Sequence, residues 1–425
     1  LSYFFEKITN RGMPRTPYNV SAFDDEYNTW RVDGGLNLKS TLKGGHTLHI
    51  QAAYNDYKRI KNTYVKDLTT LDQFLSETPG SQDTISFSLL MSRGTWTSNK
   101  ADWPLNFQLG YDISHESSLG KRIEGGEQFL QDLALFGSTE WSIGSSLLVK
   151  PAVRIAYNSR YKAPVIPSLN LKYAFNKWVV RASYARGFRS PSLKELYFDF
   201  VDINHNIVGN TDLNAEYSHN ITSDISVKKS FSKVHFKADI GFFYNIMDNL
   251  ITLAISPEDP QQYTYVNIGE YSTIGNTFNT GIRYKQIYMN IGVAHVGRFN
   301  TLSGTFPDVP RYNFSPEIRF NSTYTNKKLG FSIAGFYKYN GQRNGFFLSD
   351  ETVSQSLIND YHLLDMNITK QLLDGKIEWT LGVKNLLDVQ DITSTNGSGG
   401  VHSGNSGTIP MNWGRSFFCG LKFKI

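Results

Sequence analysis

The chain has 425 residues, more than one ordinary soluble core contains, so we expect either several domains or one large repetitive architecture. Charged residues make up only 19% of the chain and the formal net charge is +5, with both signs interspersed, which argues against nucleic acid as a partner. The single cysteine excludes an internal disulfide framework and a zinc site built from cysteines.

The amino-terminal segment has the composition of a β-strand. Residues 1–7 do not resemble a signal peptide, so we interpret the sequence as a processed or partial chain that begins inside a larger structure. No run of about 18 or more apolar residues occurs, and no membrane-spanning helix is therefore predicted.

Alternation of apolar and polar residues is the dominant pattern of the chain. It is clear over residues 48–55, 147–158, 364–369 and 377–384. Successive side chains of a strand point to opposite faces, so each of these strands has one apolar and one polar face. The polar face carries Lys, Arg, Asp and Asn on strand after strand, which suits a water-filled lumen, whereas the apolar face suits lipid.

The connections between the strands are alternately short and long. The short turns fall at 176–177, 230–233, 326–328 and 374–375, and the long polar connections at roughly 8–27, 61–83, 187–213, 342–359 and 388–410. An outer-membrane barrel alternates periplasmic turns and extracellular loops in this way. We count about 18 strands of roughly ten or more residues, enough to cross a bilayer when tilted.

The predicted fold class is therefore all-β, a transmembrane antiparallel β-barrel of the outer membrane. It should be closed, because backbone groups in lipid have to be paired within the protein. A soluble sandwich, propeller or solenoid is the alternative, but those folds turn their apolar faces inward and use shorter strands. The carboxyl terminus agrees: Phe417, Cys419, Leu421, Phe423 and Ile425 share one face. This end resembles the signal read by the barrel-assembly machinery, except that the usual last residue is aromatic.

Four segments follow one another along the chain as a recognisable set: residues 167–191, 243–251, 265–275 and 381–388. In this order they resemble the barrel of TonB-dependent outer-membrane receptors, which import metal chelates too large for porins. The resemblance implies a barrel of about 22 strands around an amino-terminal plug, which carries the segment contacted by the energy transducer TonB. Since our count is about four strands short and no plug segment is visible, we assign residues 1–425 to the carboxy-terminal barrel portion.

The segment after residue 184 is the main candidate site. In haem receptors of the family, two boxes flank a histidine that takes part in haem uptake. The boxes correspond here to Phe188-Arg189-Ser190-Pro191 and Asn210-Thr211-Asp212-Leu213, with His205 between them. Both boxes deviate from the family pattern, at Ser190 and Thr211. The candidate ligand-binding residues are Arg189, Tyr197, Asp202, Asn204, His205 and Asn206.

Physical reasons support and oppose this site. A neutral imidazole is a good iron ligand, and Tyr197, Phe198 and Phe200 could stack on a flat macrocycle. His205 is also compatible with a solvated loop position, and Arg189 with an ion pair to a carboxylate of the inner wall. The sequence defines no other candidate metal ligand, and we interpret the further loop histidines, His115, His362 and His402, as solvated.

No catalytic motif is found, so we expect no enzyme and no intrinsic cofactor. The resemblance implies TonB-dependent import of haem, a ferric siderophore or cobalamin across the bacterial outer membrane. The expected partners are outer-membrane lipid, the TonB complex through the missing amino-terminal part, and the metal chelate. Two alternatives stay open: a passive porin-like channel, and a surface-interaction receptor paired with a surface lipoprotein.

Overall fold

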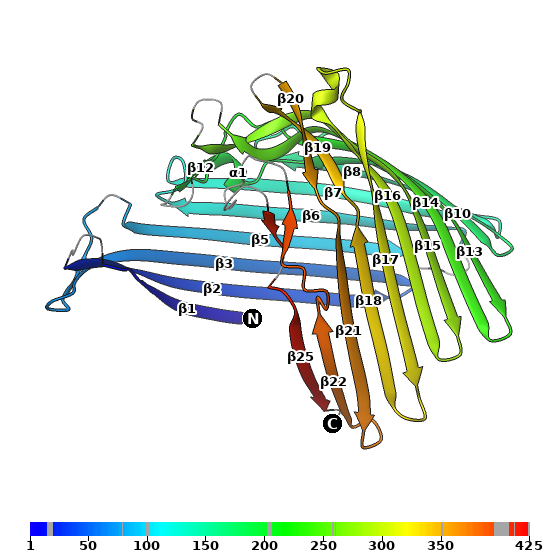
Figure 1. Cartoon of the computed structure of the whole chain (residues 1–425). Helices are drawn as coiled ribbons and strands as arrows, with labels where there is room; N and C mark the ends of the chain where they lie inside the picture. The colour runs from blue at the N-terminus through cyan, green and yellow to red at the C-terminus, as the bar shows by residue number, and fades with distance from the viewer. Residues whose placement is uncertain are drawn as a thin grey trace.

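The computed structural model describes residues 1–14, 20–78, 80–98, 100, 103–201, 206–256, 259, 261–349, 352–394, 408–411 and 413–423. Strands dominate it (Figure 1). The long strands are β1 (Ser2–Arg11), β2 (Ser21–Leu42), β3 (His46–Asp67), β5 (Gln82–Ser98), β6 (Leu105–Gly120), β7 (Glu127–Ile143), β8 (Leu147–Asn158), β9 (Ile166–Phe175), β10 (Trp178–Arg189), β13 (Glu216–Phe231), β14 (Val234–Ile255), β15 (Tyr263–Tyr284), β16 (Ile287–Phe299), β17 (Tyr312–Asn326), β18 (Phe331–Asn340), β21 (Tyr361–Leu372), β22 (Ile377–Lys384) and β25 (Ser416–Phe423).

The short elements lie in the long connections. They are β4 (Gln73–Leu75), the helix α1 (Leu193–Tyr197), β11 (Phe200–Val201), β12 (Asn206–Val208), the 3-10 helix η1 (Thr301–Gly304), and the hairpins β19 (Arg343–Ser349) with β20 (Thr352–Ile358) and β23 (Asp391–Thr393) with β24 (Thr408–Pro410). No helix among the described residues is long and apolar enough to cross a membrane.

The long strands form one antiparallel meander. The main sheet has 21 strands in the described part of the chain, and without the short β4, β11 and β12 it has 18, as the alternation predicted. Each long strand pairs with the next long strand along the chain. The tight turns gather at one end of the sheet and the long connections at the other (Figure 1). The predicted alternation of turns and loops is confirmed.

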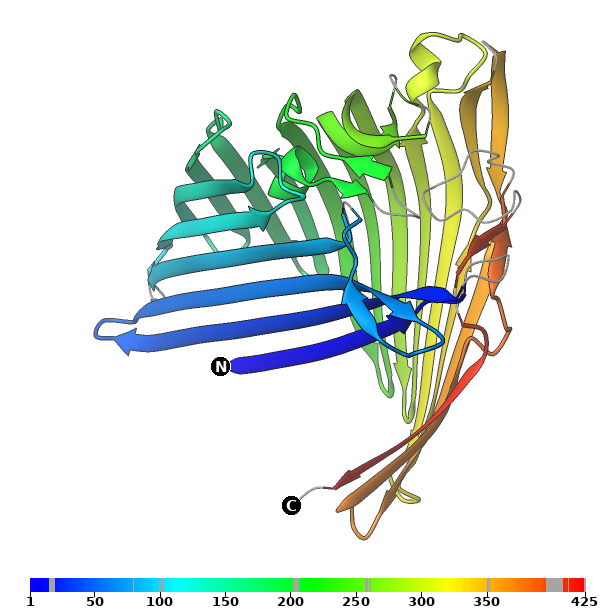
Figure 2. The ribbon, with the colours of Figure 1, turned by 90° about the vertical axis from the view of Figure 1, so that its left-hand side faces the viewer.

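The sheet is strongly curved, but its two edges stay apart (Figure 2). No pairing joins β1 to β25 among the described residues, so the expected closed cylinder is not complete here. Each edge strand, β1 and β25, has only one neighbouring strand in the described part of the chain, and an open arc of this kind spans only part of a cylinder's circumference. An open edge in lipid leaves backbone groups unpaired, which is costly.

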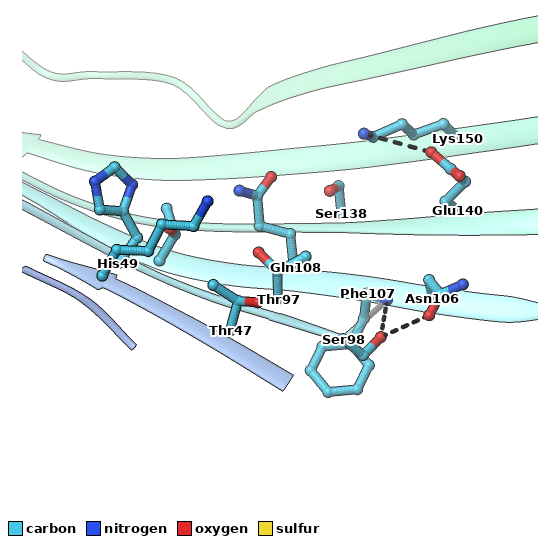
Figure 3. Close-up of a pocket in the computed structure, with 12 residues that line it drawn as sticks. Thr47, His49, Thr97, Ser98, Asn106, Phe107, Gln108, Ser138, Glu140 and Lys150 are labelled. Carbon is cyan, nitrogen blue, oxygen red and sulfur yellow. Dashed lines mark hydrogen bonds and ion pairs between the residues drawn. The ribbon is translucent and has the colours of Figure 1, made fainter. Parts of the chain in front are cut away.

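One face of the sheet is polar, and ion pairs link its neighbouring strands. Asp112 on β6 accepts from Arg93 at 2.6 Å and from Arg154 at 3.0 Å. Arg181 on β10 lies 2.9 Å from Asp224 on β13. The same face forms a cavity of about 480 Å³ near the turn end (Figure 3). It is lined mainly by hydroxyl, amide and charged side chains, including Lys39, His49, Gln108, Glu140 and Lys150.

The opposite face is apolar and exposed. Leu135, Ile155, Ile240 and Leu421 are each 60% or more accessible, although none of them lies in a loop. Large aliphatic side chains on a strand remain this exposed in a stable protein when the face is covered by something other than water. The predicted division into an apolar and a polar face is therefore confirmed.

Several predicted boundaries were wrong. The connections expected at 8–27 and 61–83 are partly strand, because β2 and β3 are each 22 residues long and continue where both faces are polar. Strands that extend beyond a bilayer need no apolar face, so their ends look like loops in the sequence. His115 and His362 consequently lie on β6 and β21 rather than in loops, whereas His402 lies outside the described residues.

Candidate functional site

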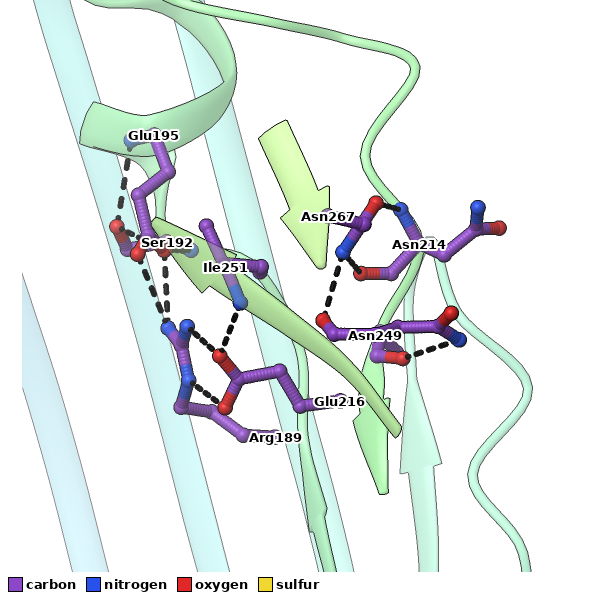
Figure 4. Close-up of polar contacts among 9 residues, drawn as sticks. Arg189, Ser192, Glu195, Asn214, Glu216, Asn249, Ile251 and Asn267 are labelled. Atoms are coloured by element: carbon purple, nitrogen blue, oxygen red, sulfur yellow. Dashed lines mark hydrogen bonds and ion pairs between the residues drawn. The ribbon is translucent and has the colours of Figure 1, made fainter. Parts of the chain in front are cut away.

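The segment 187–213 begins and ends at an ion pair. Arg189, the last residue of β10, is the direct cross-strand partner of Glu216, the first residue of β13. Its Nε and Nη2 donate to the two carboxylate oxygens of Glu216 at 2.7 and 2.6 Å, and its Nη1 donates to Glu195 at 2.9 Å (Figure 4). A guanidinium shared by two carboxylates in this bidentate geometry is a strong, directional contact. It fixes the base of the loop.

A capped helix follows the ion pair. Ser192 is the N-cap of α1: its hydroxyl accepts from the N–H of Glu195, and the carboxylate of Glu195 accepts from the N–H of Ser192 at 2.8 Å. This reciprocal arrangement is a capping box, which stabilises the first turn of a helix. The same carboxylate binds Arg189, so the helix is held to the strand end that precedes it. Pro191, two residues after the end of β10, is fully buried.

The helix folds down into a small hydrophobic core at the loop end of the sheet. Side chains from β5, β7, α1 and β14 meet there. The core consists of Ile85, Ile123, Leu130, Leu193, Leu196, Tyr197, Leu213 and Ile251. Burial of this kind contributes roughly 1.5–3 kcal/mol for each large apolar side chain. The segment that the sequence suggested to be a solvated polar loop is therefore packed over the wall (Figure 2).

The returning limb of the segment is fastened to β15. Gly209 passes so close to the helix that a Cβ would lie 2.7 Å from the carbonyl oxygen of Leu196, so no larger residue fits there without a shift. Asn210 donates from Nδ2 to the carbonyl oxygen of Tyr265 at 2.7 Å. The phenol of Tyr161 donates to the carbonyl oxygen of Leu213 at 2.9 Å. The box 210–213 is thus held to β15 and to the segment that follows β8, at the loop end of the sheet.

An amide side chain completes the fastening. Asn267 on β15 accepts from the N–H of Asn214 at 2.8 Å, and its Nδ2 donates to the carbonyl oxygens of Asn214 and Asn249 (Figure 4). One half-buried side chain therefore satisfies three backbone groups, two of Asn214 and one of Asn249. We call these contacts, from Arg189 to Asn267, the mouth latch.

The structure places only some of the predicted ligand-binding residues. Arg189 lies in the ion pairs of the latch, and Tyr197 is only 3% exposed. Asn206 is half-buried on β12, where its Nδ2 donates to the carbonyl oxygen of Gln261. Asp202, Asn204 and His205 fall between β11 and β12, outside the described residues. A ligand-binding role for these six residues stays a prediction, and so does haem ligation by His205.

The two family boxes act as structural elements here. Phe188 packs its ring 5.7 Å from that of its cross-strand partner Tyr217. Leu213 is 3% exposed in the core, and Asn210 also accepts from the N–H of Asp212, which shapes the turn through Thr211. Ser190, where the first box deviates, directly follows the last residue of β10.

Sequence reasoning missed several residues of the latch. The Ser-x-x-Glu spacing of Ser192 and Glu195 is the signature of a capping box and would have revealed the helix. No local signal marks Tyr161, Glu216 or Asn267, because their partners are distant in the sequence. No group of three or more side chains suited to hold a metal ion occurs among the described residues.

Burial raises the pKa of Tyr197 and of Tyr161 above the ordinary value for tyrosine. In both cases the apolar surroundings disfavour the charged phenolate. A raised folded-state pKa means that this stabilisation is fully present below about pH 10, the pKa in the unfolded chain, and is lost as the pH rises further. The packing of the segment 193–213 around Tyr197 and Tyr161 should therefore become less stable above about pH 10.

Tyr197→Phe tests this point. The Tyr197 hydroxyl is buried and has no hydrogen-bond partner among the described residues, so its removal should change the unfolding free energy by less than about 0.5 kcal/mol at neutral pH. Above about pH 10 the variant should retain slower amide hydrogen exchange over residues 193–213 than the wild type. Equal alkaline sensitivity of the two proteins would contradict the assignment, and Tyr3→Phe, an exposed site, is the control.

The long antiparallel strands, the division into an apolar and a polar face, and the latch at one end together define an outer-membrane β-barrel protein. Comparison with known families agrees: the family model "TonB dependent receptor-like, beta-barrel" matches residues 2–386. The chain belongs to this family. Its place is the bacterial outer membrane.

Solved structures show the same fold at low sequence identity. The siderophore receptor PirA from Pseudomonas aeruginosa is 13% identical with a TM-score of 0.62, over 98% of this chain and 75% of that one. The ferric enterobactin receptor PfeA from Pseudomonas aeruginosa, solved with enterobactin, is 14% identical with a TM-score of 0.64, over 99% and 78%. The copper transporter OprC is 12% identical with a TM-score of 0.65, over 100% and 72%. No curated protein sequence matches the chain.

Proposed function

We propose that the protein imports a metal chelate across the outer membrane in a TonB-dependent manner. The observation that carries this proposal is the match of residues 2–386 to the receptor barrel family. Similar structures include receptors for siderophores and a transporter for copper, which supports a metal-containing ligand. Haem, a ferric siderophore and cobalamin all remain candidates, and no catalytic step is involved.

The long connections would face the outside of the cell in this proposal. Strands of a bacterial barrel join by short turns on the periplasmic side and longer loops on the outer side. The mouth latch then lies at the outer rim and gives the ligand-binding loops a fixed platform. The polar wall, with its cross-strand ion pairs, provides a wet path below them. TonB would act through a plug, as the family resemblance implies.

Two rival functions make different predictions. A passive porin-like channel would conduct ions without a bound chelate and would show no saturable affinity for one. A receptor that works with a surface lipoprotein would retain that lipoprotein during purification. Calorimetry with haemin, ferric siderophores and cyanocobalamin on the purified protein separates these cases. Saturable binding of one chelate supports import, whereas conductance without binding of any chelate would contradict it.

His205→Ala tests the haem hypothesis. If haem is the cargo and the imidazole of His205 is a ligand, the variant should bind haemin about tenfold or more weakly, because one iron bond is lost. The Soret band of the complex should also shift, since axial ligation determines it. His235→Ala, at the turn end of β14, is the matched control. An unchanged spectrum and affinity would remove His205 from the site.

A further inference from the structure

A second cavity lies at the loop end of the polar face, next to the mouth latch. Its volume is about 260 Å³. It lies between the ends of β15, β16 and β17 and the start of the β19–β20 hairpin, near the upper rim in Figure 1. The side chains that matter for its chemistry are Tyr271, Arg298, Asn300, Asn313, Arg343 and Asn344.

The cross-strand register puts this cavity on the inner wall. Arg298 on β16 is the direct partner of Thr273 on β15 and of Asn313 on β17. Tyr271 is two residues from Thr273 on the same strand, so its side chain shares their face. This is the face that carries the ion pairs of the polar wall, for example Arg298 with Glu317 on the neighbouring strand. A molecule that enters the mouth can therefore reach the cavity.

The cavity has more positive charge than its surroundings neutralise. Arg298 lies 3.5 Å from Glu317, but the same carboxylate also lies 3.6 Å from Arg319, so one negative charge serves two guanidinium groups. Arg343 makes no side-chain hydrogen bond or ion pair with any residue that the structure describes. No described Asp or Glu lines the cavity. By contrast, Lys150 in the larger cavity near the turns has its own carboxylate, Glu140, 3.8 Å away.

The remaining lining is rich in hydrogen-bond groups. Asn300 is 6% exposed, and its Nδ2 has no acceptor among the described residues. Its Oδ1 already accepts from the N–H of Leu302, so the amide cannot simply be flipped to hide the donor. A buried donor without an acceptor is rare in folded proteins. Tyr271 adds a ring that can stack on a flat group.

We propose that this cavity binds one arm of a negatively charged, oxygen-rich aromatic chelate, such as a ferric catecholate. Guanidinium groups bind paired oxygens with charge-assisted hydrogen bonds, and their planes stack on aromatic rings. The volume accommodates a single catechol-sized arm and not a whole chelate, since sites for complete ligands usually exceed about 300 Å³. A neutral hydroxamate complex has no net negative charge to pair with the two arginines. The assignment rests on the proposed import function and narrows its substrate.

The position of the cavity links it to the mouth latch. Tyr265 and Asn267 of β15 bind the returning limb of the segment 187–213, and the cavity begins at Ile268 on the same strand. A ligand held by Arg343 would therefore be adjacent to the loop that contains the sequence-predicted ligand residues. The contacts of the mouth latch and the lining of the cavity thus follow each other directly along β15.

Arg343→Gln is the primary test. The purified protein is titrated in detergent with the anionic ferric complex of a tris-catecholate, the neutral ferric complex of a tris-hydroxamate, haemin and cyanocobalamin. The catecholate complex should bind most tightly, and Arg343→Gln should weaken it about tenfold at low salt because a charge-assisted contact is lost. The difference should shrink as ionic strength rises. Asn344→Asp, which puts a negative charge in the cavity, should weaken binding at least as much.

Arg283→Gln is the control, because it removes the same charge from an exposed position at the turn end of β15, the opposite end of that strand from the cavity residue Tyr271. It should bind the catecholate complex like the wild type. If the wild type binds this complex and both cavity variants bind it equally well, the cavity assignment is wrong while the import function stands. Preferential binding of the hydroxamate complex, haemin or cobalamin would overturn the substrate class. Failure to bind any of the four would overturn the proposed function and the cavity with it.

Discussion

Leu196→Ala is expected to destabilise the mouth by about 2–5 kcal/mol, because it removes a fully buried side chain and leaves a cavity. Leu196 is 1% exposed and lies on α1, where it packs in the core with residues from β5, β7 and β14. The same core positions the carbonyl oxygen of Leu196 against Gly209, so the returning limb should loosen too.

Amide hydrogen exchange is the measurement for this variant. Exchange over residues 193–213 should accelerate by a factor of at least about thirty, since each 1.4 kcal/mol is tenfold in the opening equilibrium. The strands near the turns should keep the protection that they have in the wild type. Lys194→Ala, an exposed position on the same helix, is the control and should change exchange by less than about threefold. Unaltered exchange in Leu196→Ala would mean that the helix does not hold the loop.

Phe278→Arg is expected to cost about 2–4 kcal/mol when the protein folds into a bilayer, because it places a charge on the lipid face. Phe278 is 42% exposed and faces the apolar side of β15, opposite Ile240 on β14. β15 is 22 residues long and ends at a tight turn six residues after Phe278, so this position falls near the middle of the roughly ten residues that cross the membrane.

The neighbouring residue provides the matched control. Asn279 is exposed on the polar face of the same strand, opposite Asp239. Asn279→Arg introduces the same side chain one residue away and should fold with nearly the wild-type free energy, since the charge reaches water and a carboxylate. Equilibrium unfolding in lipid vesicles with denaturant measures both variants. Equal destabilisation by the two substitutions would contradict the division of the faces.

The sequence predicted the strands well because their signal is local and repeated. Apolar and polar residues alternate over most of residues 147–158 and over residues 377–384, and β8 and β22 occupy these ranges. A one-residue slip in such a strand would exchange its two faces, so the pattern specifies the register as well. The boundaries at the loop end were less predictable, because β2 and β3 leave the apolar environment before they end.

The mouth latch could be predicted only in part. The boxes 188–191 and 210–213 lie in the segment that forms the latch, but they did not predict that this segment folds into a core. That core depends on contacts with Ile85 and Leu130, which are far away in the sequence. Asn267 and Glu216 look like ordinary polar residues until the register places them beside Asn214 and Arg189. Long-range partners of this kind leave no trace in a single sequence.

The cavity at Arg343 was not predicted for a similar reason. Arg298, Arg319 and Arg343 are spread over three strands, and their shortage of carboxylates becomes visible only after the strands are paired.

Whether the sheet closes into a cylinder could not be predicted from single strands either. Alternation shows which face a strand presents, but it does not show which edge strand meets which.

The central claim is that the apolar face of the wall contacts lipid and the polar face contacts water. Spin labels test it most directly, attached to single cysteines at Ile240 and Phe278 or at Asp239 and Asn279, in a Cys419→Ser background and in lipid bilayers. Labels at Ile240 and Phe278 should collide mainly with dissolved oxygen, and labels at Asp239 and Asn279 mainly with a water-soluble nickel complex. Accessibility that is equal at all four positions, or reversed between the faces, would contradict a membrane barrel.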